Sequence, residues 1–265
     1  ADGNLLFTAT NQAQVYTSID QADSWEMIAD TMDTQPYGTD LLLIKGDAVF
    51  FTQNIGEGPY NYICLSGFSG WGPWQELAHQ SSALISIVDN DSLIFTLLNG
   101  ISISSDVGET WTEIPEPPIT GYIRLNLATN DYLYVSHGCQ VYRTADLGQT
   151  WEDITGILDD VGFPSPYSCS TVLAMARHDD QLIISMYWGG GKGKLFLSDD
   201  YGTSWTVLNE FPVDHSVNAI ASKNNVLYVG TASTLSGVYY TTDLTTWIDF
   251  SSGLQSYDYS VSQLV

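Results

Sequence analysis

Ser104-Ser105-Asp106-Val107-Gly108-Glu109-Thr110-Trp111 is the stretch of this chain that decides its fold. The same pattern, Ser/Thr-x-Asp-x-Gly-x-Ser/Thr-Trp, returns in full at residues 144–151 and 198–205. Three further stretches are variants of this pattern. Residues 18–25 have Ala22 in place of the glycine, and residues 241–247 are one residue shorter. Residues 66–74 are one residue longer and lack the aspartate. Repetition of this kind indicates an architecture built from one repeated unit.

Each residue type that recurs in the copies of the pattern has a role in a tight turn. The aspartate side chain can accept hydrogen bonds from backbone N–H groups of the turn. The glycine can adopt a positive φ, and the tryptophan ring can pack beneath the turn. We therefore expect these residues to stabilise the fold and not to catalyse a reaction. The set comprises Asp20, Trp25, Asp106, Trp111, Asp146, Trp151, Asp200, Trp205, Asp243 and Trp247.

The spacing of the turns predicts a β-propeller. Their tryptophans recur roughly every 44 residues along the chain, which gives six units. The last unit shows four segments with strand patterns, at 217–221, 226–231, 237–241 and 247–250, and the repeated turn lies between the third and fourth of them. The expected fold is all-β: a single domain, residues 1–265, forming six four-stranded antiparallel blades.

The two ends of the chain predict how the ring closes. The first unit begins at its second strand, residues 5–8, so its first strand is missing. Residues 259–265 follow the sixth unit and have strand composition. We expect this C-terminal strand to complete blade one, because pairing the two termini leaves no inner edge unpaired.

The repeated turn resembles the Asp-box, the repeat of bacterial neuraminidases and other sialidase-like β-propellers, and the resemblance extends over nearly the whole chain. Sialidases of this type clamp the substrate carboxylate with three arginines and use a Tyr/Glu nucleophile pair. This chain has three arginines, of which Arg143 and Arg177 are expected at the end of the blades where the repeated turns lie. The Phe-Arg-Ile-Pro phrase of sialidases has no counterpart, so we do not expect a sialidase.

Other families that the chain resembles also bear on its function. Xyloglucan-type glucanases have a similar turn but use paired seven-bladed propellers with a cleft between them. Photosystem assembly factors and sortilin-like receptors use Asp-boxes without catalysis, and the former carry an arginine patch. With seven basic residues against 31 acidic ones, this chain does not provide such a patch.

Composition excludes several partners. The formal net charge is −24, so we expect no binding to nucleic acid, which requires clusters of Lys and Arg. An anionic membrane surface is disfavoured for the same reason. No apolar run is long enough to span a bilayer, so membrane insertion is not expected. We expect a secreted or periplasmic monomer; Ala1 is compatible both with signal-peptide removal and with a shortened chain.

Cysteine and histidine residues do not form a recognisable metal-binding motif. Cys64, Cys139 and Cys169 match no zinc spacing, and we expect buried thiols, with a Cys139–Cys169 bridge as the alternative. A site built from His79, His137 and His215 is a less favoured alternative, and neither a metal nor a cofactor is expected. The glycine-rich residues 187–194 lack the phosphate-loop pattern and are expected to form a hairpin loop.

The candidate ligand-binding face is the one opposite the repeated turns, where the loops between blades carry aromatic and acidic residues. Arg124 is the one cation expected near the mouth of the channel there. The candidate residues are Tyr37, Arg124, Tyr167, Tyr187, Trp188, Asp214, His215 and Tyr257. They favour recognition of a glycan or protein without catalysis.

Two alternatives to this interpretation stay open. The first is a glycoside hydrolase or lyase with carboxylates at the channel mouth, for which the candidates are Asp33, Asp159, Asp160, Asp214 and Asp258. The second is a scaffold subunit of a secreted assembly.

Overall fold

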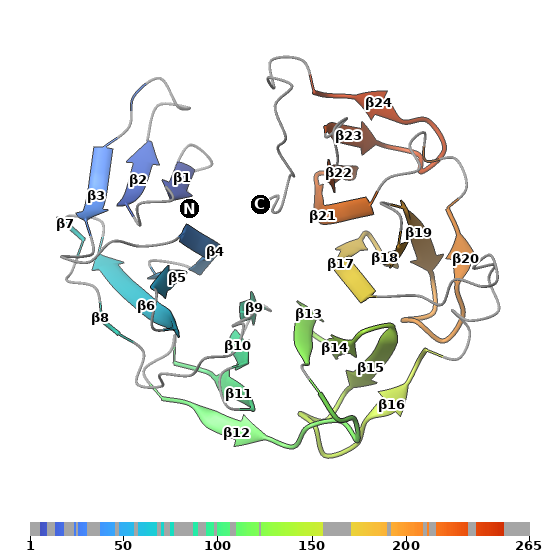
Figure 1. The fold of residues 1–265 in the computed structure, drawn as a ribbon, viewed down its shortest axis with the longest axis horizontal. Coiled ribbons are helices and arrows are strands. Elements are labelled where there is room, and N and C mark those ends of the chain that lie inside the picture. Colours follow the sequence, from blue (N-terminus) through green and yellow to red (C-terminus); the bar gives the residue numbers. More distant parts are fainter. Residues whose placement is uncertain are drawn as a thin grey trace. The chain divides into compact units, whose positions relative to one another are not determined.

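The computed structural model describes the backbones of the strands between residues 6 and 97, and then most of the chain. From residue 100 the described ranges are 100–106, 110–121, 123–155, 171–189, 192–208, 211, 216–232 and 237–251. These residues form β-strands and turns (Figure 1). In the described part of the chain, no helix is long and apolar enough to cross a membrane. The chain divides into two compact units, Ala1–Glu116 and Pro117–Val265.

The first unit contains three antiparallel sheets. The sheet nearest the N-terminus has three strands, β1 (Leu6–Ala9), β2 (Gln14–Ser18) and β3 (Glu26–Asp30). The second sheet has β4 (Gly38–Lys45), β5 (Ala48–Ile55) and β6 (Gly58–Gly67), and both β7 (Gly70–Trp71) and β8 (Gln75–Glu76) pair with β6. The third has β9 (Ile87–Asp89), β10 (Ile94–Leu97), β11 (Ile101–Ser104) and β12 (Thr112–Ile114).

The second unit contains three four-stranded antiparallel sheets with their strands in chain order (Figure 1). One has β13 (Arg124–Ala128), β14 (Leu133–His137), β15 (Gln140–Thr144) and β16 (Glu152–Asp153). The next has β17 (Thr171–His178), β18 (Gln181–Gly189), β19 (Lys192–Ser198) and β20 (Thr206–Val207). The last has β21 (Ser216–Lys223), β22 (Val226–Ala232), β23 (Val238–Thr241) and β24 (Ile248–Asp249).

The strands agree with the sequence pattern in the second unit. All four strands expected between residues 217 and 250 are present as β21 to β24, and the repeated turn joins the third strand to the fourth in each sheet. Among the described residues, the first sheet of the chain contains three strands, which is compatible with its short N-terminal pattern. Residues 259–265, expected to complete it, lie outside the described residues.

The middle sheet of the second unit is buried on both faces, which explains its apolar sequence. Side chains alternate along a strand, so Leu182, Ile184 and Met186 share one face of β18 while Ile183 and Ser185 share the other. The first three pack in a core with Tyr134 of β14. Ile183 packs in a second core with residues of β21 and β22. The two cores join the three sheets into one unit.

Polar contacts also join these sheets. Ser185 Oγ donates to the carbonyl of Val217 at 2.7 Å. His178 is buried, and its Nδ1 lies 2.9 Å from Ser222 Oγ on β21. Pairing of a buried polar group removes the cost of leaving it without a partner.

The hairpin expected at residues 187–194 is present, but its loop is shorter than expected. Residues 187–189 end β18 and residues 192–194 begin β19, with Tyr187 opposite Gly193 and Gly189 opposite Lys192. Between these pairs the register shifts at Trp188, so the backbone forms a β-bulge there. The sequence favoured a loop because glycine is rare in strands, but a glycine run next to a bulge is compatible with a paired hairpin.

Candidate functional site

Antiparallel pairing gives each sheet of the second unit two distinct ends. At one end, which we call the repeat-turn end, the first strand turns into the second and the third turns into the fourth. At the other end, the opposite end, the second strand turns into the third and the chain passes between sheets. The residues at the repeat-turn end are described in most detail.

The aspartate of each complete turn accepts hydrogen bonds on both carboxylate oxygens, as predicted. Asp146 Oδ1 accepts from the Thr150 backbone N–H at 2.8 Å, and Oδ2 accepts from the Thr150 hydroxyl at 2.6 Å. The Thr144 hydroxyl also donates to Oδ1, at 2.8 Å. Asp106 and Asp200 have the same three contacts with the equivalent residues. These carboxylates therefore organise the turns.

In the turns at 144–151, 198–205 and 241–247, one further residue is in the left-handed region, which the sequence did not indicate; Gly108 of the turn at 104–111 lies outside the described residues. Gly148 and Gly202 have positive φ as predicted, 83° and 95°. The residue before each glycine is left-handed as well, Leu147 at 56° and Tyr201 at 60°, although bulky residues rarely adopt this conformation. In the short copy, Leu244 at 60° keeps the bend without a glycine.

The tryptophans of the turns are buried to different extents. Trp205 is 4% exposed and belongs to the core that joins β14 to β18. A Cβ on Gly202 would lie 3.1 Å from its ring, so the ring packs directly beneath the turn. Trp111, Trp151 and Trp247 are half-buried. Trp247 meets Phe211 edge to face at 4.9 Å, and both rings pack against the core of β18, β19, β21 and β22.

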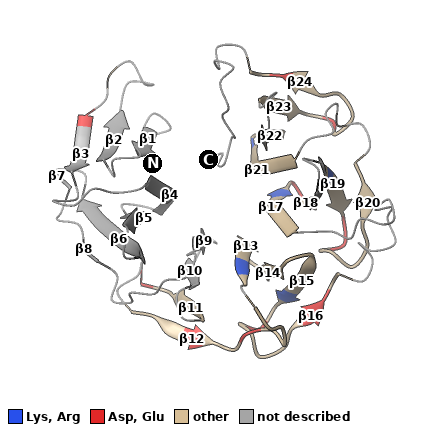
Figure 2. Cartoon of the chain, in the orientation of Figure 1, with Lys and Arg blue, Asp and Glu red and all other residues tan. Residues whose placement is uncertain are grey.

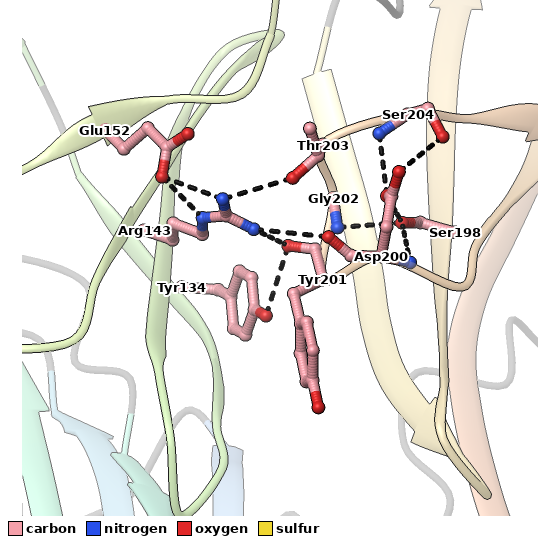
Figure 3. Close-up of polar contacts among 9 residues, drawn as sticks. All are labelled: Tyr134, Arg143, Glu152, Ser198, Asp200, Tyr201, Gly202, Thr203 and Ser204. Carbon is pink, nitrogen blue, oxygen red and sulfur yellow. Dashed lines mark hydrogen bonds and ion pairs between the residues drawn. The ribbon is translucent and has the colours of Figure 1, made fainter.

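Arg143 joins two neighbouring sheets at the repeat-turn end (Figure 3). This buried guanidinium on β15 donates to the carbonyl of Tyr201 at 2.6 Å and to the Thr203 hydroxyl at 3.2 Å, both in the turn of the next sheet. It also pairs with Glu152 at 2.8 Å and lies 4.9 Å from the centre of the Tyr132 ring. Arg143 therefore stabilises the packing of these two sheets against each other.

The same hydrogen bonds lower the pKa values of the turn aspartates. The Thr110 hydroxyl and backbone N–H, followed by the Ser104 hydroxyl, lower the pKa of Asp106 from 3.8 to about 2. The Thr150 hydroxyl and N–H lower that of Asp146 in the same way. For Asp200, burial is the largest effect and raises the pKa, but the hydrogen bonds from Ser204 and Ser198 together outweigh it. All three carboxylates are stabilised in the charged form.

Acid should therefore destabilise the protein. A carboxylate whose pKa is depressed on folding contributes stability that is complete above its unfolded pKa and is lost as the pH falls through its folded pKa. We expect the melting temperature to fall between about pH 4 and about pH 2. Asp146→Asn should show a shallower fall than the parent. Equal slopes for the two proteins in melts across this range would contradict this role of Asp146.

Two of the candidate ligand-binding residues are described at the opposite end. Arg124, the first residue of β13, is exposed and lies across from Ser136. Tyr187 of β18 is half-buried and lies across from Thr171. Their strands belong to adjacent sheets that meet there, since the Val172 N–H donates to the Gly138 carbonyl at 2.8 Å. The structure thus brings the two residues to the same end of neighbouring sheets.

The remaining candidates are not described at the level of their side chains. For Trp188 the structure describes the backbone, in β18. Tyr37, Tyr167, Asp214, His215 and Tyr257 lie outside the described residues, as do Asp20 and Trp25 of the first turn and the alternative carboxylates Asp33, Asp159, Asp160 and Asp258.

Arg124 shares the opposite end of the sheets with two lysines, and its being the only cation near the mouth of the channel stays a prediction. Lys192 begins β19 and Lys194 lies two residues further on, so both belong to the same end of the next sheet. From residue 100 on, the described basic residues are spread over β13, β15, β17, β19 and β21 (Figure 2).

One cysteine differs from the expectation. Cys139, in the turn between β14 and β15, is disulfide-bonded and is not the free thiol favoured by the sequence. The ring of His137 lies against Gly121, where a Cβ would clash with it. Among the described residues, no group of three or more His, Cys, Asp or Glu side chains is placed to hold a metal ion.

Comparison with known proteins identifies the fold. Neither a protein-family profile nor a curated protein sequence matches the chain. Solved structures do match it over nearly its full length. The GH74 enzyme of Niastella koreensis is 16% identical with a TM-score of 0.66, and the GH74 xyloglucanase from Xanthomonas campestris is 15% identical with a TM-score of 0.65. YCF48 bound to a D1 peptide is 16% identical with a TM-score of 0.64.

The fold is a β-propeller. The similarity covers 94% of this chain for the Niastella enzyme and for YCF48, and 93% for the Xanthomonas enzyme. The chain spans 44% and 43% of the two GH74 structures and 79% of YCF48, so it corresponds to less than half of either GH74 enzyme. At these identities the similarity concerns the fold alone.

Proposed function

We propose that this β-propeller is a secreted or periplasmic recognition module that binds a neutral glycan without cleaving it. The observation that carries this proposal is the division of roles between the two ends of the sheets. At the repeat-turn end, the carboxylates of three complete turns are committed to hydrogen bonds within the turns. At the opposite end, exposed Arg124 and half-buried Tyr187 come from adjacent sheets. Binding sites commonly lie in loops at one end of a rigid scaffold.

The chemistry of the candidate residues supports a neutral ligand. Aromatic rings can stack on sugar rings, and carboxylates can accept hydrogen bonds from sugar hydroxyls. A formal net charge of −24 repels sialic acids, uronates and nucleic acid. Tyr37, Tyr167, Trp188 and Tyr257 would provide stacking surfaces, and Asp214 and His215 would provide polar contacts.

A glycoside hydrolase is the alternative function, and the similarity to the two GH74 enzymes favours it. In that case two of the carboxylates at the opposite end would flank the scissile bond, about 5–5.5 Å apart for retention or 6.5–9.5 Å apart for inversion. A protein ligand is the third possibility, because YCF48 binds a peptide.

We further propose that the repeated turns are Asp-boxes and that the chain is one six-bladed domain closed by its C-terminus. The three-stranded first sheet supports this, because residues 259–265 could supply its fourth strand. Deleting residues 260–265 should expose the inner edge of β1. We expect the melting temperature to fall by roughly 4–8 °C, equivalent to about 2 kcal/mol. A truncated protein that melts with the parent would contradict closure.

A screen on arrays of neutral glycans, sialylated glycans and peptides tests the ligand class. We expect binding to neutral glycans. Trp188→Ala should weaken that binding about fivefold or more, equivalent to about 1 kcal/mol, at an unchanged melting temperature. The matched control is Tyr201→Asn, which removes an exposed aromatic ring at the repeat-turn end and introduces a residue that tolerates positive φ. Loss of binding in Tyr201→Asn but not in Trp188→Ala would place the binding site at the repeat-turn end and contradict the proposal.

A further inference from the structure

One cysteine at the opposite end of the second unit takes part in a disulfide bond. Cys139 is disulfide-bonded and lies in the turn between β14 and β15. The chain contains two other cysteines, Cys64 and Cys169. The described backbone around Cys139 favours Cys169.

The hydrogen bond from the Val172 N–H to the Gly138 carbonyl, at 2.8 Å, brings the start of β17 beside the turn that contains Cys139. Cys169 precedes Val172 by three residues. An extended chain advances about 3.3–3.6 Å per residue, so the three residues of chain limit the separation of Cys169 from this hydrogen bond to roughly 10 Å. Cys64 lies on β6, opposite Val49, and is 75 residues from Cys139 in the sequence, so no short stretch of chain ties it to this turn.

We propose that Cys139 and Cys169 form a disulfide that fastens the sheet of β13–β16 to the first strand of the next sheet. Forming it removes two protons and two electrons from the two thiols. A disulfide donor such as oxidised glutathione accepts the electrons and is itself reduced to two thiols. Such bonds persist in oxidising compartments, so the bridge fits a protein that acts outside the cytosol.

The disulfide would complement the Arg143 contacts described above. Arg143 joins these two sheets at the repeat-turn end, through the carbonyl of Tyr201. The Cys139–Cys169 bridge would join them at the opposite end, where Arg124 and Tyr187 lie. Reduction should therefore loosen the opposite end while leaving the repeat turns in place. The bridge would make the geometry of the candidate ligand-binding end dependent on the redox state of its surroundings.

Peptide mapping tests the pairing. The protein is unfolded in the presence of an alkylating reagent, digested without reduction by a protease that cuts at Asp and Glu, and analysed by mass spectrometry. Residues 146–160 contain several such sites, so Cys139 and Cys169 fall in separate peptides. We expect one linked pair of peptides, containing Cys139 and Cys169, and alkylated Cys64. A Cys64–Cys139 linkage or a bridge between two chains would overturn the proposal.

Hydrogen exchange tests the consequence. In Cys139→Ser, the Val172 amide should exchange at least tenfold faster than in the parent, and the melting temperature should fall by roughly 5–10 °C. The amides of Gly202 and Ser204, which donate to side chains of the repeat turn, should keep their rates. Cys64→Ser is the matched control and should behave as the parent. If Cys139→Ser does not fold, mild reduction of the folded parent gives the same comparison. An unchanged Val172 rate would refute the proposed link.

Discussion

Trp205→Ala should lower the free energy of unfolding by about 3–5 kcal/mol, the usual cost of removing a buried tryptophan side chain. Trp205 is 4% exposed, and its ring fills the core between β14, β18 and the turn at Gly202. Alanine would leave a cavity that the paired strands around it cannot close. Chemical denaturation followed by circular dichroism measures the change.

Trp205→Phe is the matched control for this prediction. The indole N–H of Trp205 is buried without a hydrogen-bond partner among the described residues, so phenylalanine removes an unsatisfied donor and retains most of the apolar volume. We expect a loss of less than about 1.5 kcal/mol. Trp151→Ala should cost less than Trp205→Ala, because Trp151 is half-buried. Equal losses for all three variants would show that the ring does not fill the core as described.

Arg143→Ala should destabilise the protein by about 2–4 kcal/mol, the second largest effect that we expect. The substitution removes the donors to Tyr201, Thr203 and Glu152 together and leaves the carbonyl of Tyr201 without this partner. Arg143→Lys should recover only part of the loss, because an ammonium group cannot reproduce the planar set of donors. Thermal and denaturant melts measure both variants.

Glu152→Gln separates the ion pair of Arg143 from its hydrogen bonds to the turn of the next sheet. The Glu152 side chain is 58% exposed, and an exposed ion pair contributes about 1 kcal/mol or less. We therefore expect little change in this variant. If Glu152→Gln were as destabilising as Arg143→Ala, the ion pair and not the bond to the neighbouring turn would hold the sheets together.

Local sequence patterns predicted much of the fold. Alternation of apolar residues located β21 and β22, and Asn224-Asn225 between them has the positive φ values, 53° and 62°, of a tight turn. The repeated aspartates predicted the hydrogen bonds of the turns, because each acceptor and its donors lie within four residues in the sequence.

Contacts between distant segments could not be predicted in this way. Arg143 and its acceptor Tyr201 are 58 residues apart, and a backbone carbonyl has no sequence signal. Gly189, after Trp188, was expected in a loop, because its pairing with Lys192 depends on the opposing strand. From the sequence, Cys139 could be a free thiol or part of a disulfide, because the spacing of cysteines does not specify which of them pair. For the candidate site, the sequence located Arg124 and Tyr187 at one end of the sheets, but the chemistry of that end depends on residues outside the described part.

An assay of binding and hydrolysis on the same sample tests the central claim most directly. The glycan that binds best in the array is incubated with the parent protein, and its amount and chain length are followed by mass spectrometry while binding is measured by calorimetry. We predict that the glycan is bound and recovered intact, and that Trp188→Ala reduces its affinity. Accumulation of shortened glycan, abolished by Asp214→Asn or Asp258→Asn in a protein that still folds, would show a hydrolase and contradict the proposed recognition function.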